Sequence, residues 1–332
     1  MTRARRHDNL WAELTGFRNL LRAFEQARRG KRRHENVAAF EVELERELFR
    51  LQDELRGKTY APGPYRTFQI CEPKPRLISA APFRDRVVHH ALCRVLVPIF
   101  EPTFLGDSYA CRVGKGTHAA VDRFVAFARR CRYVLKCDVA KYFPSIDHEI
   151  LKGQIARKVT DRDVLWLANR IIDASNAQEE VREWFPGDDL FAPGGRRRGL
   201  PLGNQTSQFF ANVYLSPLDH FIKEVLRAPC YLRYVDDFLL LSDDKGWLAE
   251  ARERCREFLA GLRLRLHPRK AAVSRVADGT RLLGYRVWPT HRLLPRANVT
   301  RMRRRLRRLR ARGDLKRPAA RAALAGWWGH AR

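Results

Sequence analysis

The stretch CYLRYVDDFLLLSDD, residues 230–244, places two adjacent aspartates, Asp236 and Asp237, between an aromatic run and a run of leucines. Neighbouring side chains of a β-strand point to opposite faces of a sheet, so both carboxylates cannot enter an apolar core. Buried charges persist when they are paired or bind a metal ion. The pattern therefore predicts a β-hairpin whose tip carries the aspartate pair, where solvent or metal can reach both carboxylates.

A third carboxylate, that of Asp138, lies in the predicted strand YVLKCDVAKYF, residues 133–143, at the end of its YVLKCD part. Three acidic side chains without His or Cys suit a hard cation such as Mg²⁺. Two such ions about 3.5–4 Å apart form the arrangement that enzymes use to move phosphoryl groups. We therefore predict that Asp138, Asp236 and Asp237 hold two Mg²⁺ ions, with Mn²⁺ as a substitute. The alternative is a β-turn with solvated acids, which an isolated YVDD would favour.

The charge of the chain indicates its partners. Its 332 residues include 65 Lys and Arg against 37 Asp and Glu, a formal net charge of +28. A chain this basic usually acts on a polyanion, most often nucleic acid. The alternative is a general arginine enrichment from a GC-rich genome. Hydrophobic residues make up 45% of the chain, which is enough for a core, and the length predicts two or three subdomains.

Cysteine usage and hydropathy indicate the compartment. Seven scattered cysteines without CxxC pairs argue against a zinc site and against a disulfide framework, and reduced thiols are typical of the cytoplasm. The N-terminus lacks an apolar signal core, and no apolar run reaches the length of a membrane span. The sequence thus predicts a soluble, cytoplasmic protein without membrane contact.

Hydrophobic periodicity and turn residues predict the elements around these acids. Helical patterns cover 8–56, 81–100, 117–130, 148–158, 161–174, a long segment from Gln205 onward, and 246–262. Besides 133–143 and the hairpin, strands are predicted as a pair in TFQICEPKPRLISA (67–80) and as one late strand, RLLGYRVWP (281–289). The basic tail RMRRRLRRLRAR (301–312) has apolar residues at helical spacing among its arginines, so it predicts a helix.

Four segments, in this order, resemble the motifs of reverse transcriptases. KCDVAKYFPSID (136–147) resembles motif A, GLPLGNQTSQFFANVYL (199–215) motif B, RYVDDFLLL (233–241) motif C and LLGYR (282–286) motif E. The likeness extends from about Tyr65 to the C-terminus and is specific because the motifs occur together. It implies RNA-directed DNA polymerase activity, a nucleotidyltransfer that uses template RNA, a primer or cDNA end, and dNTPs.

The resemblance also implies a fold and its parts. The expected fold class is α+β, in the form of a right-hand polymerase. Its expected parts are an N-terminal helical extension (1–60), fingers (61–130), a palm (131–290) with inserted finger helices (about 148–200), and a basic helical thumb (291–332). Relatives continue with more helix after GWWGHAR, so a short or truncated thumb is expected.

Further segments resemble the reverse transcriptases of diversity-generating retroelements. These are EPKPRLISA, YACRVGKGTHAAV, LLGYRVWPTHRLL and GWWGHA, together with Ser207–Gln208 in motif B, where retroviral enzymes carry Ser-Pro. This subtype implies adenine-mutagenic copying of template-repeat RNA, a small, basic, oligomeric accessory protein, and a bacterial, archaeal or phage genome. A retron-like or host-defence enzyme and a non-catalytic RNA-binding protein on a polymerase scaffold are the alternatives. A group II intron enzyme is disfavoured because no maturase or endonuclease extension follows the thumb.

Residue roles near the metals follow from the resemblance. The Val139 carbonyl is expected to join the three aspartates as a metal ligand. Phe143, five residues after Asp138, matches the steric gate that excludes a ribose 2′-hydroxyl, although a core aromatic is a serious rival. Lys270 matches a lysine that protonates the leaving pyrophosphate, with Arg269 as its neighbouring competitor.

The remaining roles concern the nucleotide and the nucleic acid. Lys74 and Arg76 match the finger strands that grip the triphosphate, and Arg76 is preferred because a guanidinium holds phosphate through two donors. The other residues expected to bind the dNTP are Leu202, Gly203 and Gln208. Lys115, in the Gly-Lys-Gly turn, is expected near template phosphates. The thumb residues expected to contact phosphates are Arg301, Arg303, Arg304, Arg307 and Arg308, and the alternative there is a solvated helix with an ordinary buried stripe.

Overall fold

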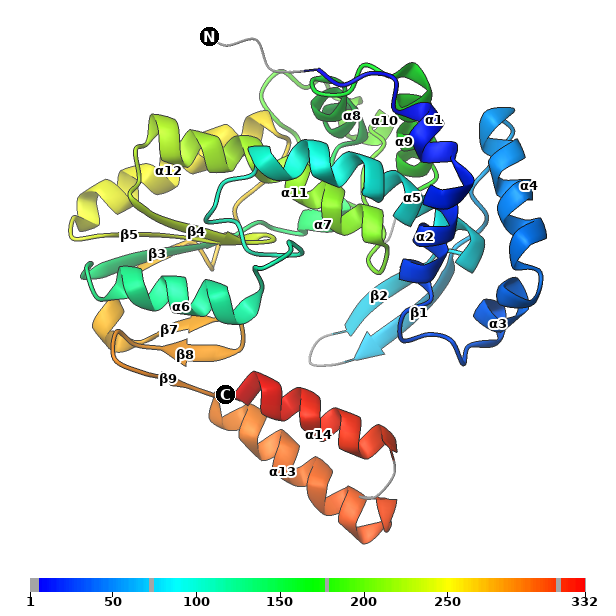
Figure 1. Ribbon diagram of the computed structural model, residues 1–332. Coiled ribbons are helices and arrows are strands. Elements are labelled where there is room, and N and C mark those ends of the chain that lie inside the picture. Colours follow the sequence, from blue (N-terminus) through cyan, green and yellow to red (C-terminus); the bar gives the residue numbers. More distant parts are fainter. Residues whose placement is uncertain (1–5, 72–74, 177–178, 315–317, 332) are drawn as a thin grey trace.

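A four-stranded antiparallel sheet forms the centre of the computed structural model, which describes residues 6–71, 75–176, 179–314 and 318–331 (Figure 1). The sheet order is β4-β5-β3-β6. Its strands are β3 (Tyr133–Asp138), β4 (Cys230–Tyr234), β5 (Asp237–Ser242) and β6 (Ala272–Arg275). The predicted hairpin is confirmed, because β4 and β5 pair on either side of a turn at Val235 and Asp236. Strand β6 was not predicted.

The sheet buries both faces, as its apolar strands require. In β3, Leu135 and Cys137 contribute to the larger core, which contains α5 (Phe83–Phe100), α11 (Gln205–His220) and α12 (Lys245–Gly261). Val134, which points to the opposite face, packs in a second core with α6 (Thr117–Ala128). Figure 1 shows α6 on one side of the sheet and α11 and α12 on the other. The alternation follows from the two-residue period of a strand.

The N-terminal helices pack on α5 and beside the hairpin formed by β1 (Arg66–Cys71) and β2 (Pro75–Ala80) (Figure 1). The long helical pattern predicted for 8–56 is divided into four helices. They are α1 (Trp11–Thr15), α2 (Phe17–Ala27), α3 (Glu35–Val42) and α4 (Leu44–Arg56). The divisions fall at Gly16, whose ψ of 135° is extended, at the turn 28–34, and at Glu43, which leaves helical geometry.

The next four helices after β3 are α7 (Tyr142–Ser145), α8 (His148–Ala156), α9 (Arg162–Asp173) and α10 (Ala192–Gly195). Of these, α8 and α9 match the helices predicted at 148–158 and 161–174, whereas the short α7 and α10 were not predicted. Asp147 and Asp161 start α8 and α9, because each carboxylate accepts hydrogen bonds from two amides of the first turn. Such side-chain caps satisfy N–H groups that have no partner inside the helix.

Two strand predictions were too long. Strand 133–143 ends at Asp138, because Lys141 adopts a left-handed φ of 45° and α7 follows at once. The late strand 281–289 is two strands, β7 (Thr280–Leu282) and β8 (Tyr285–Val287), with β9 (Arg292–Leu293) beside β8. Leu283 and Gly284 both have positive φ, 48° and 89°, which fits the two-residue turn of a tight hairpin.

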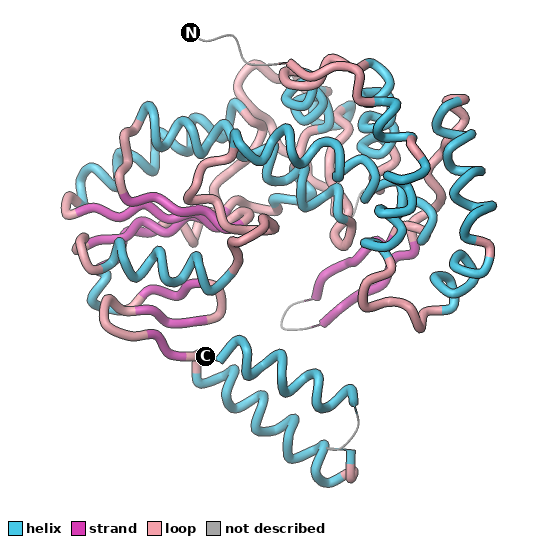
Figure 2. The backbone as a smooth tube through the Cα atoms, viewed as in Figure 1, coloured by secondary structure: helices cyan, strands magenta, loops and turns pink. Residues whose placement is uncertain are grey.

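The tail forms two helices, α13 (Arg296–Ala311) and α14 (Pro318–Ala331), and the helix predicted for 301–312 is confirmed. Figure 2 shows this helical pair after the last strands of the chain. The antiparallel sheet and surrounding helices confirm the α+β class. No helix in the described parts of the chain is long and apolar enough to span a membrane.

Candidate active site

The three predicted aspartates meet at one end of the β3–β5 strand pair. Asp138 and Asp237 are directly paired residues of β3 and β5. The side chains of such a cross-strand pair lie on the same face. Asp236 sits in the hairpin turn, and its carbonyl accepts a hydrogen bond of 3.2 Å from the Val139 amide. The pairing of β3 with β5 therefore joins two sequence segments about a hundred residues apart into one acidic site.

The turn that carries Asp236 has an unusual backbone. Val235 adopts a left-handed φ of 56°, a conformation that is a genuine outlier for a β-branched residue. Such strain persists only when the surroundings hold it in place. The support comes from Arg233, whose Nη1 donates to the Val235 carbonyl at 2.9 Å.

Arg233 is fully buried and is itself held by a polar network. Its guanidinium donates to both carboxylate oxygens of Asp219 in α11, at 2.6 and 2.7 Å, and to Asn212 at 3.2 Å. The Tyr231 hydroxyl donates to the same Asp219 carboxylate. The turn that carries Asp236 is thus connected to α11 through a buried ion pair. Sequence reasoning missed this network, although an arginine inside the apolar run CYLRY was a signal.

Two lysines face the aspartates. Lys270 Nζ lies 2.8 Å from both carboxylate oxygens of Asp138. Lys136 Nζ lies 3.4 Å from Asp237 Oδ1, within ion-pair distance but without hydrogen-bond geometry. Lys136 was missed, yet it precedes Asp138 by two residues in β3 and therefore shares its face.

The site carries more negative charge than these lysines neutralise. Burial, and then the Asp237 and Asp138 carboxylates, raise the pKa of Asp236 to about 6. Burial also raises the pKa of Asp237, against the opposing effect of Lys136. Among the described residues, Asp237 Oδ1 is buried without a hydrogen-bond partner. A hard cation would supply the missing charge and ligand.

The described residues nevertheless contain no group of three or more His, Cys, Asp or Glu side chains already gathered as a metal cage. Lys270 occupies both oxygens of Asp138. The three carboxylates are the type of ligand that Mg²⁺ prefers. A bound ion would have to replace the contacts that Lys270 and Lys136 make with them.

The other residues predicted to bind the nucleotide lie on several elements. Phe143 is half-buried, and its ring contacts Tyr142 edge to face, 5.5 Å between centroids. The Leu202 carbonyl accepts a hydrogen bond from the Ser79 amide of β2 at 3.1 Å, which joins this segment to the β1–β2 hairpin. Gly203 has a φ of 112° and, like Gln208 and Arg76, is exposed. Lys74 lies outside the described residues. Roles for this set remain predictions.

The family model of reverse transcriptase, described as an RNA-dependent DNA polymerase, matches residues 70–287. The chain belongs to the reverse transcriptase family. It is therefore an RNA-directed DNA polymerase, a nucleotidyltransferase, as the motifs predicted.

Individual relatives are distant. Protein YkfC of Escherichia coli is 26% identical, with 76% of this chain and 74% of that protein covered. The group II intron-encoded protein LtrA of Lactococcus lactis is 25% identical, with 54% of this chain and 29% of that protein covered. Among solved structures, apo telomerase from Candida tropicalis matches 73% of this chain and 59% of its own at 14% identity, with a TM-score of 0.48.

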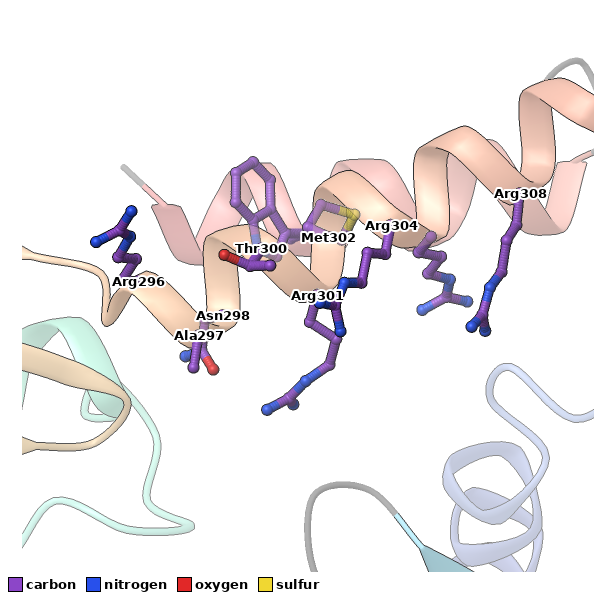
Figure 3. A pocket seen from close by; sticks show the side chains of 10 residues that line it. Arg296, Ala297, Asn298, Thr300, Arg301, Met302, Arg304 and Arg308 are labelled. Carbon is purple, nitrogen blue, oxygen red and sulfur yellow. The ribbon is translucent and has the colours of Figure 1, made fainter.

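The basic tail of this reverse transcriptase forms a groove of about 1060 Å³ along α13, with Trp327 of α14 as part of its wall. The arginines that line the groove are Arg296, Arg301, Arg304, Arg305 and Arg308. Figure 3 shows Arg301 and Arg308 projecting from the same side of α13. Arg303 and Arg307, which were also predicted to bind nucleic acid, do not line this groove, and Arg305 was missed. The groove-lining arginines from Arg301 to Arg308 are three or four positions apart, so they share one face of the helix.

Lys115 is engaged within the protein. Its Nζ donates to the Gly106 carbonyl at 2.6 Å and lies 4.9 Å from the centre of the Tyr109 ring. Gly114 and Gly116 have positive φ, so the turn itself is built as predicted. Template binding by Lys115 remains a prediction.

Proposed function

We propose that this enzyme extends a primer 3′-hydroxyl on an RNA template, with chemistry at Asp138, Asp236 and Asp237. The observation that carries the proposal is the pairing of β3 with β5, which sets Asp138 opposite Asp237 beside the Asp236 turn. Two Mg²⁺ ions held by these carboxylates and the Val139 carbonyl would activate the 3′-hydroxyl and neutralise the triphosphate. Purified protein, tested for dNTP incorporation on a primed RNA template with and without EDTA, provides the direct experiment.

Other side chains have supporting roles in this proposal. Lys270 carries an ammonium proton within the site and is proposed to deliver it to the leaving pyrophosphate. Arg76 and Lys74 are proposed to hold the triphosphate, with Leu202, Gly203 and Gln208 along the nucleotide. Leu202 cannot hydrogen-bond the sugar or the base pair, which is consistent with error-prone copying.

The finer function that we propose is mutagenic cDNA synthesis from template-repeat RNA in a diversity-generating retroelement, with a small basic accessory protein. Its support is the set of segments quoted for that subtype. The second candidate is an intron-encoded or retron-like enzyme, and the likeness to LtrA favours the intron-encoded form. Sequencing the RNA that copurifies and the cDNA made from it separates them: substitutions concentrated at template adenines support the first, and faithful copies of an intron or a branched retron RNA support the second.

Arginines on the groove side of α13 are expected to carry the electrostatic part of nucleic-acid binding. Each phosphate contact releases counterions, so log K falls with log salt by about 0.7–0.9 per contact. Replacing Arg304, Arg305 and Arg308 with Gln should therefore flatten the slope by roughly 2–3. The matched control replaces Arg303, Arg307 and Arg310, which are exposed on the same helix outside the groove. Equal slopes for the two triple variants would contradict a role for the groove.

Phe143→Ala is expected to relax sugar selection. In this proposal the half-buried Phe143 ring lies where a 2′-hydroxyl would go and excludes it by steric overlap. Its removal should therefore raise the use of rNTPs relative to dNTPs by on the order of 10²-fold. The loss of stability should stay below the roughly 3–5 kcal/mol of a fully buried Phe. Phe258→Ala is the control, because Phe258 is also half-buried and stacks on Phe221. Steady-state incorporation of both sugars, measured beside thermal unfolding, checks the prediction. Unchanged selection in a folded Phe143→Ala variant would rule out the gate.

A further inference from the structure

A small polar pocket of about 90 Å³ lies apart from the carboxylates, where three segments meet. The turn after α2 contributes Lys31. Helix α5 contributes Arg86, His89 and His90, which share one face of the helix. The start of α11 closes the pocket. None of the four named side chains has a role in the chemistry proposed above.

The pocket gathers positive charge without acidic partners. Burial, and then the Arg86 charge, lower the pKa of Lys31. Burial and the charges of Lys31 and Arg86 lower the pKa of His90 to about 4. All three side chains line this pocket. The Arg86 guanidinium donates to the Ala81 carbonyl at 2.9 Å, and among the described residues no carboxylate forms an ion pair with Lys31 or Arg86. Two cations held together in this way favour an anion between them.

The N-terminus of α11 adds donors to the pocket. Asn204 occupies the capping position, but its side chain is used elsewhere: Oδ1 accepts from the Ala81 amide at 3.4 Å, and Nδ2 donates to the Ser79 carbonyl at 3.3 Å. The first-turn amides of this 16-residue helix therefore lack a side-chain cap. Uncapped amides and the positive end of the helix dipole suit an anion.

His89 supplies an independent sign of a missing ligand. Its side chain lines the pocket, is only 2% exposed, and has an Nδ1 without a hydrogen-bond partner among the described residues. Burial lowers the pKa of His89 to about 3, so its ring is neutral at pH 7 and can donate one N–H. In the tautomer protonated at Nδ1, this atom is a buried donor without an acceptor, which is costly, and an anion oxygen would satisfy it.

We propose that this pocket binds one phosphate group. Its volume suits a single phosphate and excludes a nucleoside. The source of the phosphate rests on the proposed function: it is either the backbone of the nucleic-acid strand or the phosphate end of a free nucleotide. Gly203 and Gln208, at the edge of the pocket, connect it to motif B.

Titration with inorganic phosphate, followed by NMR of the His89 and His90 imidazole signals at constant ionic strength, tests the pocket. Both signals should shift saturably in the wild type and in Arg33→Gln, which removes an exposed charge from the same turn. Lys31→Gln and Arg86→Met should weaken the binding at least about tenfold, a loss of about 1.4 kcal/mol. Thermal unfolding verifies that each variant is folded. Signals that do not shift in the wild type, or that shift equally in Lys31→Gln, would overturn the proposal.

Two further measurements on Lys31→Gln identify the source. A flatter salt slope for single-stranded RNA, by about 0.7, with an unchanged KM for dNTPs assigns the pocket to the strand backbone. A raised KM with an unchanged slope assigns it to the nucleotide. If neither changes, the assignment to this enzyme's substrates is overturned. Phosphate titration needs no polymerisation, so saturable shifts in a protein without extension activity would refute the proposed function and leave the pocket standing.

Discussion

Asp236→Asn is expected to reduce primer extension about 10³-fold or more, which corresponds to at least about 4 kcal/mol of transition-state stabilisation. The amide keeps the shape of the side chain but removes a negative charge from the Asp138–Asp237 edge, and a neutral amide oxygen is a weaker ligand for a hard cation. RNA binding should remain, because none of the three aspartates lines the α13 groove. Gel-based extension beside RNA affinity measures both effects. Asp243→Asn, exposed in the same stretch, is the control and should extend as the wild type does.

Although Asp236→Asn should lose extension activity, its free energy of unfolding at pH 7 should not fall. The pKa of Asp236 is raised in the folded protein, to about 6 from an ordinary value of 3.8. The ionised carboxylate therefore disfavours folding above pH 6, and its protonated form contributes stability only at lower pH. Without divalent cation, Asp236→Asn should be at least as stable as the wild type at pH 7, and this difference in stability should shrink as the pH falls from about 6 to about 4.

Substantial primer extension by Asp236→Asn with Mg²⁺ would contradict the assignment of the metal site.

Arg233→Met is expected to destabilise the enzyme by about 3–5 kcal/mol, because it leaves the Asp219 charge buried and unpaired. The double variant Arg233→Met with Asp219→Asn removes both charges and keeps an acceptor for Tyr231, so most of the stability should return. Chemical denaturation of the wild type, the single variant and the double variant measures this recovery.

Activity should not recover with stability. The double variant still lacks the donor to the Val235 carbonyl, so the left-handed turn that carries Asp236 loses its support. We expect kcat to fall about 10–100-fold while the KM for dNTPs stays within about twofold, because Arg233 positions the Asp236 turn without contacting the nucleotide. Wild-type kcat in the stable double variant would show that Arg233 only stabilises the fold.

Local patterns predicted most of the elements that carry the site. An aspartate pair inside an apolar run is best accommodated at a turn, and this reasoning predicted the hairpin of β4 and β5. Helical spacing predicted α8 and α9 close to their observed bounds. Lys136 could have been found by the same reasoning, because two-residue spacing puts it beside Asp138 on β3.

Long-range pairings were not accessible from local patterns. Arg233 and Asp219 lie on different elements, and nothing near either residue identifies the other as its partner. The same holds for Lys31, which meets α5 and the start of α11 only in the folded chain. The turn at Leu283 and Gly284 was hidden because an apolar run with one glycine reads as a continuous strand. Helical spacing groups Arg301, Arg304, Arg305 and Arg308, but only packing against Trp327 shows that their side forms the groove.

Extension of a labelled DNA primer on an RNA template, by the wild-type protein with dNTPs and Mg²⁺, tests the central claim most directly. The predicted result is template-complementary DNA that requires all four dNTPs and disappears with EDTA. A folded protein that binds the primer–template but yields no product would contradict the assignment of polymerase chemistry to Asp138, Asp236 and Asp237.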